Sequence, residues 1–288
     1  AAYDFAATMA VASRVFRQFE DQYPGQAEQW LSAAVSAWQW ADKTPVTPYK
    51  QPSDVTSGEY GDDNVSDERK WAAAELFLTT EDQTYLMAFN AQTDKIDVPN
   101  WQSVAALGYL SLSNHGETLL SAQAYQQIKD AVIGLADKII NQLDNSPYLV
   151  PMTEADYVWG SNSVAANKAL ILNTALQLTD NQKYKLAMAD ILSYLLGRNP
   201  TDYSFITGFG YKPPMHIHHR PSVSDNIIEP VPGLLAGGPQ NGQQDNCDYP
   251  ADLPATSYVD DWCSFASNEI AINWNAPLVY LLASVIQE

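Results

Sequence analysis

Positive charge is scarce in this sequence of 288 residues, which holds 15 Lys and Arg against 34 Asp and Glu. A protein that binds nucleic acid neutralises phosphates with basic side chains, and a formal net charge of −19 argues against that partner. The same imbalance disfavours anionic membrane surfaces. The composition therefore excludes nucleic acid, suits a neutral ligand, and leaves carboxylates available for calcium.

Long apolar runs and several reactive motifs are also missing. No stretch of about 18 apolar residues occurs, so no segment is expected to span a membrane. The sequence has neither a Gly-x-Ser-x-Gly elbow nor a phosphate-binding glycine loop, which disfavours a nucleophilic triad and a phosphate site. No alternating pattern typical of strands appears.

Cysteine is nearly absent, since the chain has only Cys247 and Cys263. In a secreted protein these two could form a disulfide, whereas in a cytosolic protein they would remain free thiols. Two cysteines do not decide between these alternatives, and the sequence favours the disulfide only slightly.

What the sequence does contain is helical periodicity. Hydrophobic residues make up 46% of the chain, and many recur at intervals of three and four positions. The stripes with this spacing are Phe5-Met9-Ala12-Phe16-Phe19, Leu31-Ala34-Trp38-Ala41, Ile128-Val132-Leu135-Ile139, Ala165-Ala169-Leu172-Leu176, Tyr184-Met188-Ile191-Leu195 and Trp274-Leu278-Leu281-Val285. We expect an all-α fold of roughly nine helices, arranged as a toroid rather than a compact bundle.

Two long segments, 44–64 and 199–261, lack this periodicity and are rich in Pro and Gly. Loops of such length inside a compact domain are usually functional or disordered. The chain also has 8 Trp and 16 Tyr, and aromatic rings, although mostly core, are what a sugar-binding cleft requires. The histidine and aromatic content of these loops favours function.

Three of the four histidines, His216, His218 and His219, stand beside Arg220 in the second loop. A zinc site is one interpretation, but no His-Glu-x-x-His helix is present and no cysteine is close in sequence. A buried loop held by imidazole hydrogen bonds is another. We favour a third over zinc by about two to one: His218 and Arg220, on the same side of an extended segment, grip a polar, uncharged ligand.

Glu269 stands at the expected start of the last apolar helix. Most glutamates in a first helical turn only interact with the helix dipole. Alternatively, burial against Phe265 or Trp274 would raise its pKa, as a general acid needs. The sequence does not choose between the two. The nearby pair Asp260-Asp261 is typical of a solvated turn or a cap, or it orients a catalytic neighbour.

Five carboxylates and an asparagine fall within ten residues in the segment 59–68. Such a density of negative charge repels itself unless water screens it or a cation binds. The segment does not match the twelve-residue calcium loop of helix–loop–helix proteins. A solvated loop and a calcium site therefore remain equally compatible with its composition.

Two long motifs, in this order, resemble the two signatures of family 9 glycoside hydrolases, the inverting cellulases. The first comprises Arg198-Asn199-Pro200, Ser204-Phe205-Ile206-Thr207-Gly208-Phe209-Gly210 and His218-His219-Arg220-Pro221-Ser222. The second comprises Tyr258-Val259-Asp260-Asp261 and Asn268-Glu269-Ile270-Ala271-Ile272-Asn273-Trp274-Asn275-Ala276. Weaker matches are Asp4-Phe5-Ala6-Ala7, Trp71-Ala72-Ala73-Ala74-Glu75-Leu76 and Tyr157-Val158-Trp159-Gly160-Ser161-Asn162. The resemblance covers essentially the whole chain and is greatest for the subgroup with an immunoglobulin-like domain before the catalytic domain.

The resemblance implies that residues 1–288 are a single catalytic-domain portion of an (α/α)6 barrel. It implies a secreted endo-β-1,4-glucanase that hydrolyses cellulose or related β-glucans with inversion. Glu269 would be the general acid. The residues implied to bind the sugar or line the cleft are His218, Arg220, Trp159, Tyr60 and Trp274.

The resemblance also implies structural calcium and no organic cofactor. One calcium site lies near the loop that carries Asp62, Asp63, Asp67 and Glu68. The other is formed by Ser222, Asp225 and the carbonyl of Ile227. Many family members have an Asp after the tryptophan that corresponds to Trp101, and Gln102-Ser103 stand there in this chain.

The catalytic base of the family is an Asp in an Asp-Ala-Gly-Asp motif, which this sequence does not contain. The resemblance places that motif upstream of residue 1. We therefore expect the chain to be the C-terminal two-thirds of a catalytic domain that is incomplete at its N-terminal end, and to depend on that N-terminal segment. The alternatives are a non-catalytic glucan-binding fragment of the same family and an (α/α)6 glycosidase with another linkage preference.

Overall fold

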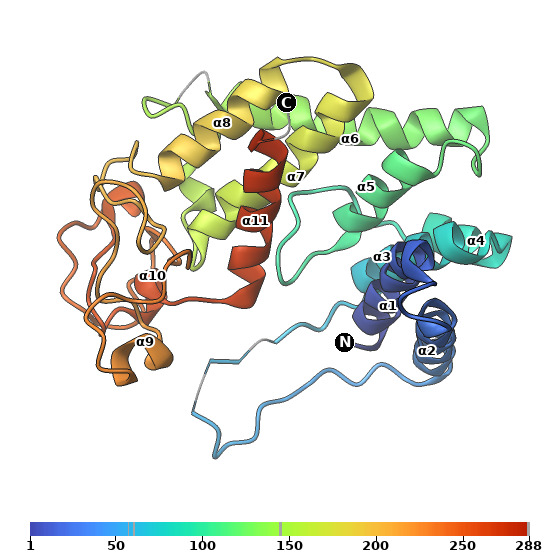
Figure 1. The fold of residues 1–288 in the computed structure, drawn as a ribbon, viewed down its shortest axis with the longest axis horizontal. Helices are drawn as coiled ribbons and strands as arrows, with labels where there is room; N and C mark the ends of the chain where they lie inside the picture. The colour runs from blue at the N-terminus through green and yellow to red at the C-terminus, as the bar shows by residue number, and fades with distance from the viewer. Residues whose placement is uncertain (57, 60, 144–145, 287–288) are drawn as a thin grey trace. The chain divides into compact units, whose positions relative to one another are not determined.

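The computed structural model describes residues 1–288 except 57, 60, 144–145 and 287–288. The described residues form α-helices joined by loops, with isolated β-bridges but no sheet among them (Figure 1). Nine of the helices in these ranges are nine residues long or longer. The all-α prediction is therefore confirmed. No helix in the described ranges is long and apolar enough to cross a membrane.

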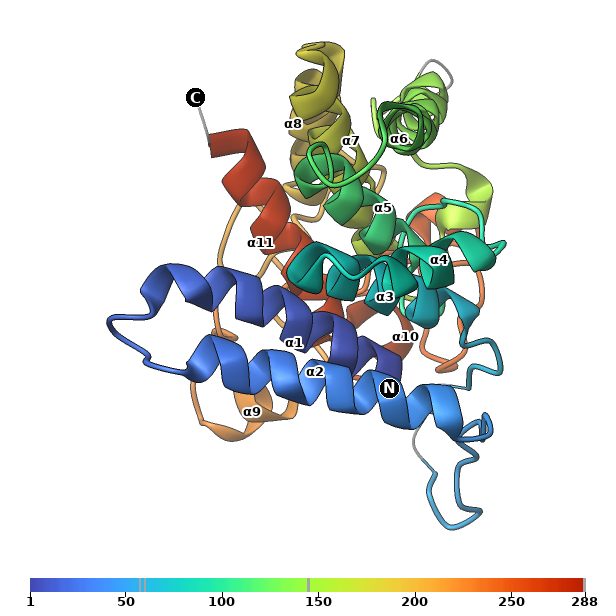
Figure 2. The ribbon, with the colours of Figure 1, turned by 90° about the vertical axis from the view of Figure 1, so that its right-hand side faces the viewer.

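The chain divides into two compact units, Ala1–Val132 and Ile133–Glu288. The first contains α1 (Ala2–Phe16), α2 (Gln26–Lys43), α3 (Ser66–Thr80), α4 (Gln83–Ala91), α5 (Ala105–His115) and the first half of α6 (Ala122–Leu143). Helix α1 lies along α2 and also packs on α3, while α3 packs against α4 and α5 (Figure 2). Helix α3 is therefore the centre of this unit.

Small side chains explain the close packing of α3. Residues 72–74 are three consecutive alanines that are fully buried, and their small size lets neighbouring helices approach closely. The buried face of α1 is likewise Ala6, Ala7, Ala10 and Ser13. The predicted stripe is confirmed only in part: Met9 packs against this core, whereas Phe5 in α1 and Phe19 in the following 3-10 turn are 48% and 42% exposed. Spacing identified the helix, but ranking residues by size missed the small side chains that form most of its buried face.

The second unit contains the rest of α6, α7 (Ser161–Thr179), α8 (Lys183–Leu195) and α11 (Ile272–Ile286), together with the short helices α9 (Arg220–Ser224) and α10 (Phe265–Asn268). Helix α7 packs against both α8 and α11. The buried residues from the predicted stripes of this unit are Leu135, Ile139, Ala165, Ala169, Leu172, Tyr184, Met188, Ile191, Leu195, Trp274, Leu278 and Leu281. These stripes are confirmed as the core of the unit.

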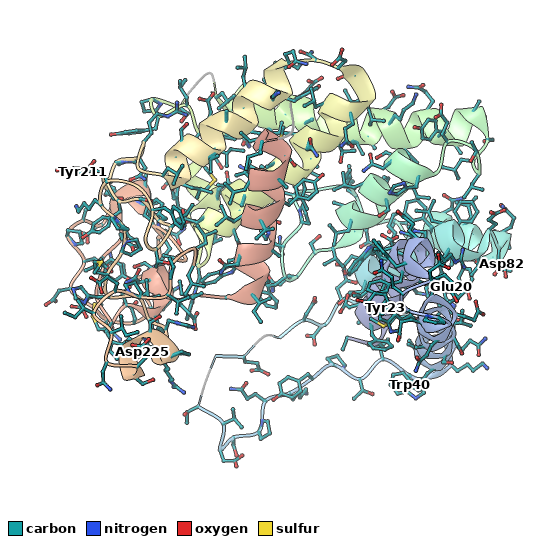
Figure 3. All side chains as sticks on the ribbon, in the orientation of Figure 1. Glu20, Tyr23, Trp40, Asp82, Tyr211 and Asp225 are labelled. Atoms are coloured by element: carbon teal, nitrogen blue, oxygen red, sulfur yellow. A yellow bond between two sulfur atoms is a disulfide. The ribbon has the colours of Figure 1, made fainter. Side chains whose placement is uncertain are left out.

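The predicted loops are also largely without helix. No helix occurs in the described part of 44–64, and 199–261 contains only α9 and a short 3-10 turn at Pro254–Thr256. The second loop has an exposed surface to which Tyr211 and Asp225 belong (Figure 3). A disulfide joins Cys247 to Cys263, whose Cα atoms are 5.8 Å apart. The slightly favoured pairing is therefore confirmed.

Candidate active site

Segments far apart in the sequence lie side by side around Glu269. The amide of His218 donates a hydrogen bond to the carbonyl of Asn268 at 2.9 Å, and the amide of Gly237 donates to the carbonyl of Glu269 at 3.0 Å. A parallel β-bridge pairs His218 with Glu269. The backbone of Glu269 is thereby held on both sides, which fixes where its carboxyl emerges.

Glu269 lies between two helices rather than inside the last one. Its backbone is extended, with φ −70° and ψ 157°, at the C-terminal end of α10, and α11 begins only at Ile272. The expectation that Glu269 starts the last helix is wrong, because pairing with His218 and Gly237 requires an extended backbone. The interpretation that Glu269 interacts with the dipole of the last helix depended on that position and is therefore also wrong.

The carboxyl of Glu269 is only partly exposed, and burial raises its pKa above the ordinary value. A hydrogen bond from the indole of Trp159, and the positive charge of His218 when its imidazole is protonated, lower the pKa, but the loss of hydration outweighs both. The group therefore keeps its proton to a higher pH than a carboxyl in water. A general acid requires that property.

A contiguous row of rings accompanies this carboxyl. The ring centroids of Trp159 and Phe265 are 5.6 Å apart, and those of Phe265 and His218 are 6.0 Å apart. His218 stacks on Trp262 with 4.4 Å between centroids and 24° between ring planes. Trp159 and Trp262 are each 37% exposed. Partly exposed rings of this kind offer apolar faces to a sugar.

The histidines of the cluster contact different neighbours. Nδ1 of His218 lies 2.8 Å from the carbonyl oxygen of Trp262, whereas Nδ1 of His219 lies 2.9 Å from the hydroxyl oxygen of Ser222. Within the described ranges, ligand atoms of three His, Cys, Asp or Glu residues come together only at Cys247, Asp261 and Cys263, where the sulfurs are already bonded. The imidazoles do not converge, and the zinc interpretation is not supported.

Arg220 is the first residue of α9, and its side chain is exposed. The extended segment predicted to include it ends at His219, with φ −137° and ψ 100°. In the described part of the chain its guanidinium has no hydrogen-bond or ion-pair partner. Its five N–H donors are therefore available to a ligand.

Trp274 is buried, with 6% of its surface exposed. Gly160, at φ +83°, lies against its ring so closely that a Cβ atom there would be 2.8 Å from ring atoms. Gly160 is also the N-cap residue of α7. Trp274 thus supports the turn that carries Trp159, rather than presenting its ring to solvent as the cleft-lining prediction requires.

Polar side chains at the start of α7 tie this turn to the segment that pairs with Glu269. The hydroxyl of Ser161 donates to the carbonyl of Pro239 at 2.6 Å, and the amide group of Asn162 donates to the carbonyl of Ala236 at 2.8 Å. Trp159 and Glu269 are therefore positioned by one connected set of hydrogen bonds.

The carboxylate of Asp260 connects two segments of the site through hydrogen bonds. Its carboxylate accepts the amides of Met215 and His216 at 2.7 and 2.9 Å, and the side-chain amide of Asn268 at 3.1 Å. These bonds join the histidine loop to the residue before Glu269. The sequence motif contained the signal, but only the fold reveals which backbone amides it meets.

The acidic segment 59–68 ends in the first turn of α3, where buried carboxylate oxygens lack hydrogen-bond donors. Asp67 is 2% exposed, and its Oδ2 accepts the amide of Val104 at 2.7 Å. Among the described residues, no donor forms a hydrogen bond with Oδ1 of Asp67. The same holds for one buried carboxylate oxygen in each of Asp4, Glu68 and Asp94. Burial, together with the nearby charges of Asp67 and Asp4, raises the pKa of Glu68 to about 7. Such oxygens suit a hard cation.

The other predicted residues of this segment are less constrained. Asp62 accepts the amide of Asn64 at 3.0 Å, and Asp63 is exposed. Tyr60, predicted to line the cleft, lies outside the described residues. Only Asp67 and Glu68 of the predicted first calcium set therefore present buried oxygens.

The second predicted calcium set has a different character. The hydroxyl of Ser222 accepts the amide of Val231 at 3.1 Å, and Asp225 accepts the amide of Ile227 at 2.9 Å. Asp225 and Ile227 are exposed. Within the described ranges this set has no buried side-chain oxygen without a donor. The donor set alone therefore gives no sign of an ion here.

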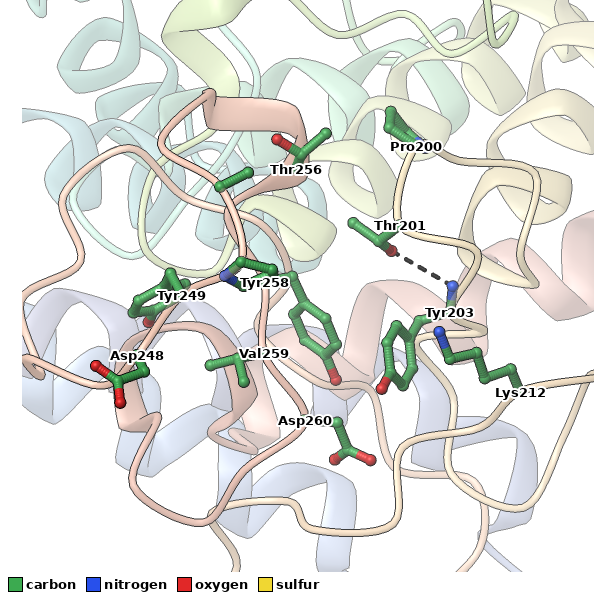
Figure 4. A pocket seen from close by; sticks show the side chains of 12 residues that line it. Pro200, Thr201, Tyr203, Lys212, Asp248, Tyr249, Thr256, Tyr258, Val259 and Asp260 are labelled. Atoms are coloured by element: carbon green, nitrogen blue, oxygen red, sulfur yellow. Dashed lines mark hydrogen bonds between the residues drawn. The ribbon is translucent and has the colours of Figure 1, made fainter.

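A cavity of about 570 Å³ lies in the same unit beside Asp260 (Figure 4). Its lining includes Tyr203, Tyr249 and Tyr258 together with Lys212, whose Nζ lies 3.8 Å from the centroid of the Tyr203 ring. None of the predicted catalytic or sugar-binding residues lines it. The candidate site is therefore defined by Glu269 and the adjoining aromatic rings of Trp159, Phe265, His218 and Trp262, not by this cavity.

The sequence matches the family model of glycosyl hydrolase family 9 over residues 1–282. The chain belongs to glycosyl hydrolase family 9. It is 39% identical over 299 residues to the xyloglucan-specific endo-β-1,4-glucanase of Bacteroides ovatus, and 35% identical over 291 residues to endoglucanase D of Acetivibrio thermocellus. These alignments cover 99% and 98% of the chain but 51% and 44% of the relatives. The chain thus spans about half the length of the curated relatives that it matches.

Solved structures of the family have the same fold. AaCel9A in complex with cellobiose-like isofagomine is 30% identical, with a TM-score of 0.91 over 100% of this chain and 55% of that one. A family 9 structure from Bacteroides ovatus is 36% identical, with a TM-score of 0.89 over 99% of this chain and 52% of that one. The predicted fold class, an (α/α)6 barrel, is confirmed.

The contact between Gly160 and Trp274 gives a stability prediction. Gly160→Ala should lower the free energy of unfolding by about 2 kcal/mol or more, because it combines a positive φ with overlap on a buried ring. Gly134→Ala is the matched control, since Gly134 lies in α6 with open space around it and should gain about 0.5–1 kcal/mol. Denaturant titration measures both, and equal stabilities would contradict the prediction.

Proposed function

We propose that the chain contributes the acid side of an active site that hydrolyses β-1,4-glucosidic bonds with inversion. The observation that carries this proposal is the partly buried carboxyl of Glu269, whose pKa is raised and which lies against Trp159 and His218. Few sites in proteins combine a neutral carboxylic acid with solvent-accessible aromatic rings. Glycosidases use such an acid to protonate the leaving oxygen.

In the proposed reaction Glu269 gives its proton to the glycosidic oxygen as the bond to the anomeric carbon breaks. A water on the opposite face of the sugar attacks that carbon, and an Asp carboxylate takes a proton from the water. In inverting enzymes the two carboxyl groups are about 6.5–9.5 Å apart. We assign the base to the Asp-Ala-Gly-Asp motif of the family, which is not among these 288 residues.

Sugar binding is assigned to the residues beside the acid. His218 and Arg220 offer polar groups to ring hydroxyls, and Trp159 offers an exposed indole edge or face. These contacts strengthen if the sugar flattens towards the transition state. Tyr60 stays a prediction, and Trp274 enters the proposal only as a support for the turn.

The substrate class is a β-1,4-linked glucan such as cellulose or xyloglucan. Relatives carry the names endoglucanase D and xyloglucan-specific endo-β-1,4-glucanase, and a structural neighbour binds a cellobiose-like compound. We further propose a secreted protein, since polymeric glucan is met outside the cell and the Cys247–Cys263 disulfide is typical of oxidising compartments. Binding without hydrolysis is the competing function.

Calcium is proposed at the first set, where Asp67 and Glu68 present buried oxygens without donors. Bound there, the ion would supply charge compensation and hold the start of α3 against the segment around Val104. The second set, Ser222 with Asp225 and Ile227, stays a prediction from the family resemblance.

The first test replaces the acid. Glu269→Gln keeps the shape of the side chain but removes the transferable proton, so the rate of reducing-end release from soluble β-glucan should fall about 100-fold or more. Glucan binding, followed by affinity electrophoresis, should persist. Glu229→Gln, an exposed glutamate in the same unit, is the control and should keep full activity. Near-normal turnover of Glu269→Gln would end the assignment, and a wild-type protein that binds glucan without cleaving it would favour the competing function.

The second test moves the pKa of the acid. The indole of Trp159 donates a hydrogen bond that stabilises ionised Glu269, so Trp159→Phe should raise the pKa further. Because a general acid is lost as pH rises through its pKa, the alkaline limb of kcat/KM should shift to higher pH. Trp40→Phe on α2 should leave the limb in place. An unmoved or more acidic limb in Trp159→Phe would contradict the role of this bond.

The third test concerns calcium and pH. Burial keeps Glu68 protonated up to about pH 7 in the ion-free protein, and its contribution to stability is lost as pH rises through that value. Calcium binds the ionised form, so the gain in Tm on adding calcium should be larger at pH 8 than at pH 5. Asp67→Asn should abolish the gain, whereas Asp54→Asn, an exposed carboxylate of the same loop, should keep it. Equal gains at both pH values would argue against this site.

A further inference from the structure

His218 makes two separate contacts with one residue, Trp262. The two rings stack at 4.4 Å between centroids, which fixes the plane of the imidazole. The backbone carbonyl oxygen of Trp262 lies 2.8 Å from Nδ1 of the same imidazole. Trp262 therefore constrains both the orientation of the ring and the chemistry of one of its nitrogens.

The second contact decides the tautomer. A backbone carbonyl oxygen only accepts hydrogen bonds, so Nδ1 of His218 must carry the proton. In the neutral imidazole the other nitrogen, Nε2, is then a bare acceptor. Within the described ranges Nε2 has no hydrogen-bond partner. An acceptor beside the proposed acid complements the donors that Arg220 supplies.

Trp262 is itself held in place by its neighbours. The next residue, Cys263, is joined through its disulfide to Cys247. The loop around Cys247 is anchored by Asp245, whose carboxylate accepts the amide of Ala266 at 2.9 Å and the hydroxyl of Ser264 at 3.0 Å. The turn that presents the carbonyl and indole of Trp262 is therefore restrained on its C-terminal side by three successive attachments, at Cys263, Ser264 and Ala266.

We propose that Trp262, held by the Cys247–Cys263 disulfide, is a positioning residue that fixes His218 as its Nδ1–H tautomer, so that Nε2 accepts a hydrogen bond from a sugar hydroxyl next to the cleaved bond. The inference rests on the proposed function. The sugar unit concerned is the one beside Glu269, because His218 and Glu269 are paired through their backbones.

A double-mutant cycle tests whether Trp262 acts through His218. In the intact protein, Trp262→Ala should lower kcat/KM on soluble β-glucan about tenfold, the loss expected for one poorly placed hydrogen bond. His218→Ala should lower it at least as much. The double variant should match His218→Ala alone, since removing the imidazole leaves Trp262 nothing to position. Additive losses would overturn the proposal and make Trp262 a separate sugar contact or a stability residue.

Two further variants separate positioning from folding. Trp262→Phe keeps an aromatic ring for stacking and should recover most of the activity lost in Trp262→Ala. Trp40→Ala removes an indole that is 60% exposed on α2 and should leave kcat/KM unchanged. Each variant is checked for an unchanged thermal transition. If Trp262→Phe has normal stability but does not restore activity, ring stacking is not what positions the His218 imidazole.

The tautomer itself is measured by NMR of protein with ¹⁵N-labelled histidine. His218, assigned from its absence in His218→Ala, should show the pattern of a protonated Nδ1 in the neutral form. Trp262→Ala and a Cys247→Ser/Cys263→Ser double variant should shift it towards a mixture with Nε2–H, and His115 should not change. A wild-type His218 protonated at Nε2 would overturn the proposal. Mild reduction of the wild-type disulfide replaces the double variant if the latter does not fold.

Separate measurements distinguish a wrong function for the protein from a wrong role for Trp262. If the proposed function is wrong, the wild-type protein releases no reducing ends and the activity cycle has no signal, while the tautomer measurement still reports on Trp262. If only the further inference is wrong, the wild-type protein is active and Glu269→Gln is not, but the Trp262 and His218 losses add.

Discussion

The backbone pairing of Glu269 with two other segments is the constraint on which the rest of the site depends. A carboxyl can act as a general acid only if it loses part of its hydration, which raises its pKa, and still remains accessible to the group that it protonates. Hydrogen bonds from the amides of His218 and Gly237 to the carbonyls of Asn268 and Glu269 meet both demands, because they hold an extended segment between two helices. The indole of Trp159 adjoins the carboxyl, which stays partly exposed.

Helices were predictable from the sequence, whereas their faces were less so. Stripes such as Tyr184-Met188-Ile191-Leu195 identified buried helices, because large apolar residues at helical spacing form one continuous face that packs against the core. At α1 and the 3-10 turn after it, the same rule selected Phe5 and Phe19, which are exposed, whereas the buried residues of α1 are alanines and a serine. Close helix packing rewards small side chains, which carry little weight in a hydrophobicity pattern.

The site was predictable as a set of residues, through the resemblance to a family, but not as an arrangement. Periodicity cannot show that an irregular loop places His218 beside Glu269, because those contacts join positions some fifty residues apart through backbone groups. It also gave no sign that Trp274 lies under Gly160, or that Asp260 meets two amides of the histidine loop. Trp262 and Asp245 were missed as supports, since neither has a pattern of its own.

The contact of Trp274 with Gly160 makes the last helix a mechanical part of the site, although that helix contributes no reacting group. A slide of α11 along its axis would withdraw the indole from beneath the turn and tilt Trp159 relative to the acid that it hydrogen-bonds. The proton affinity of Glu269 is thereby linked to the register of a helix whose anchors, Leu278 and Leu281, lie in the core of the second unit. Substitutions at Leu278 or Leu281 would therefore change the pKa of Glu269 without altering any group that contacts a sugar.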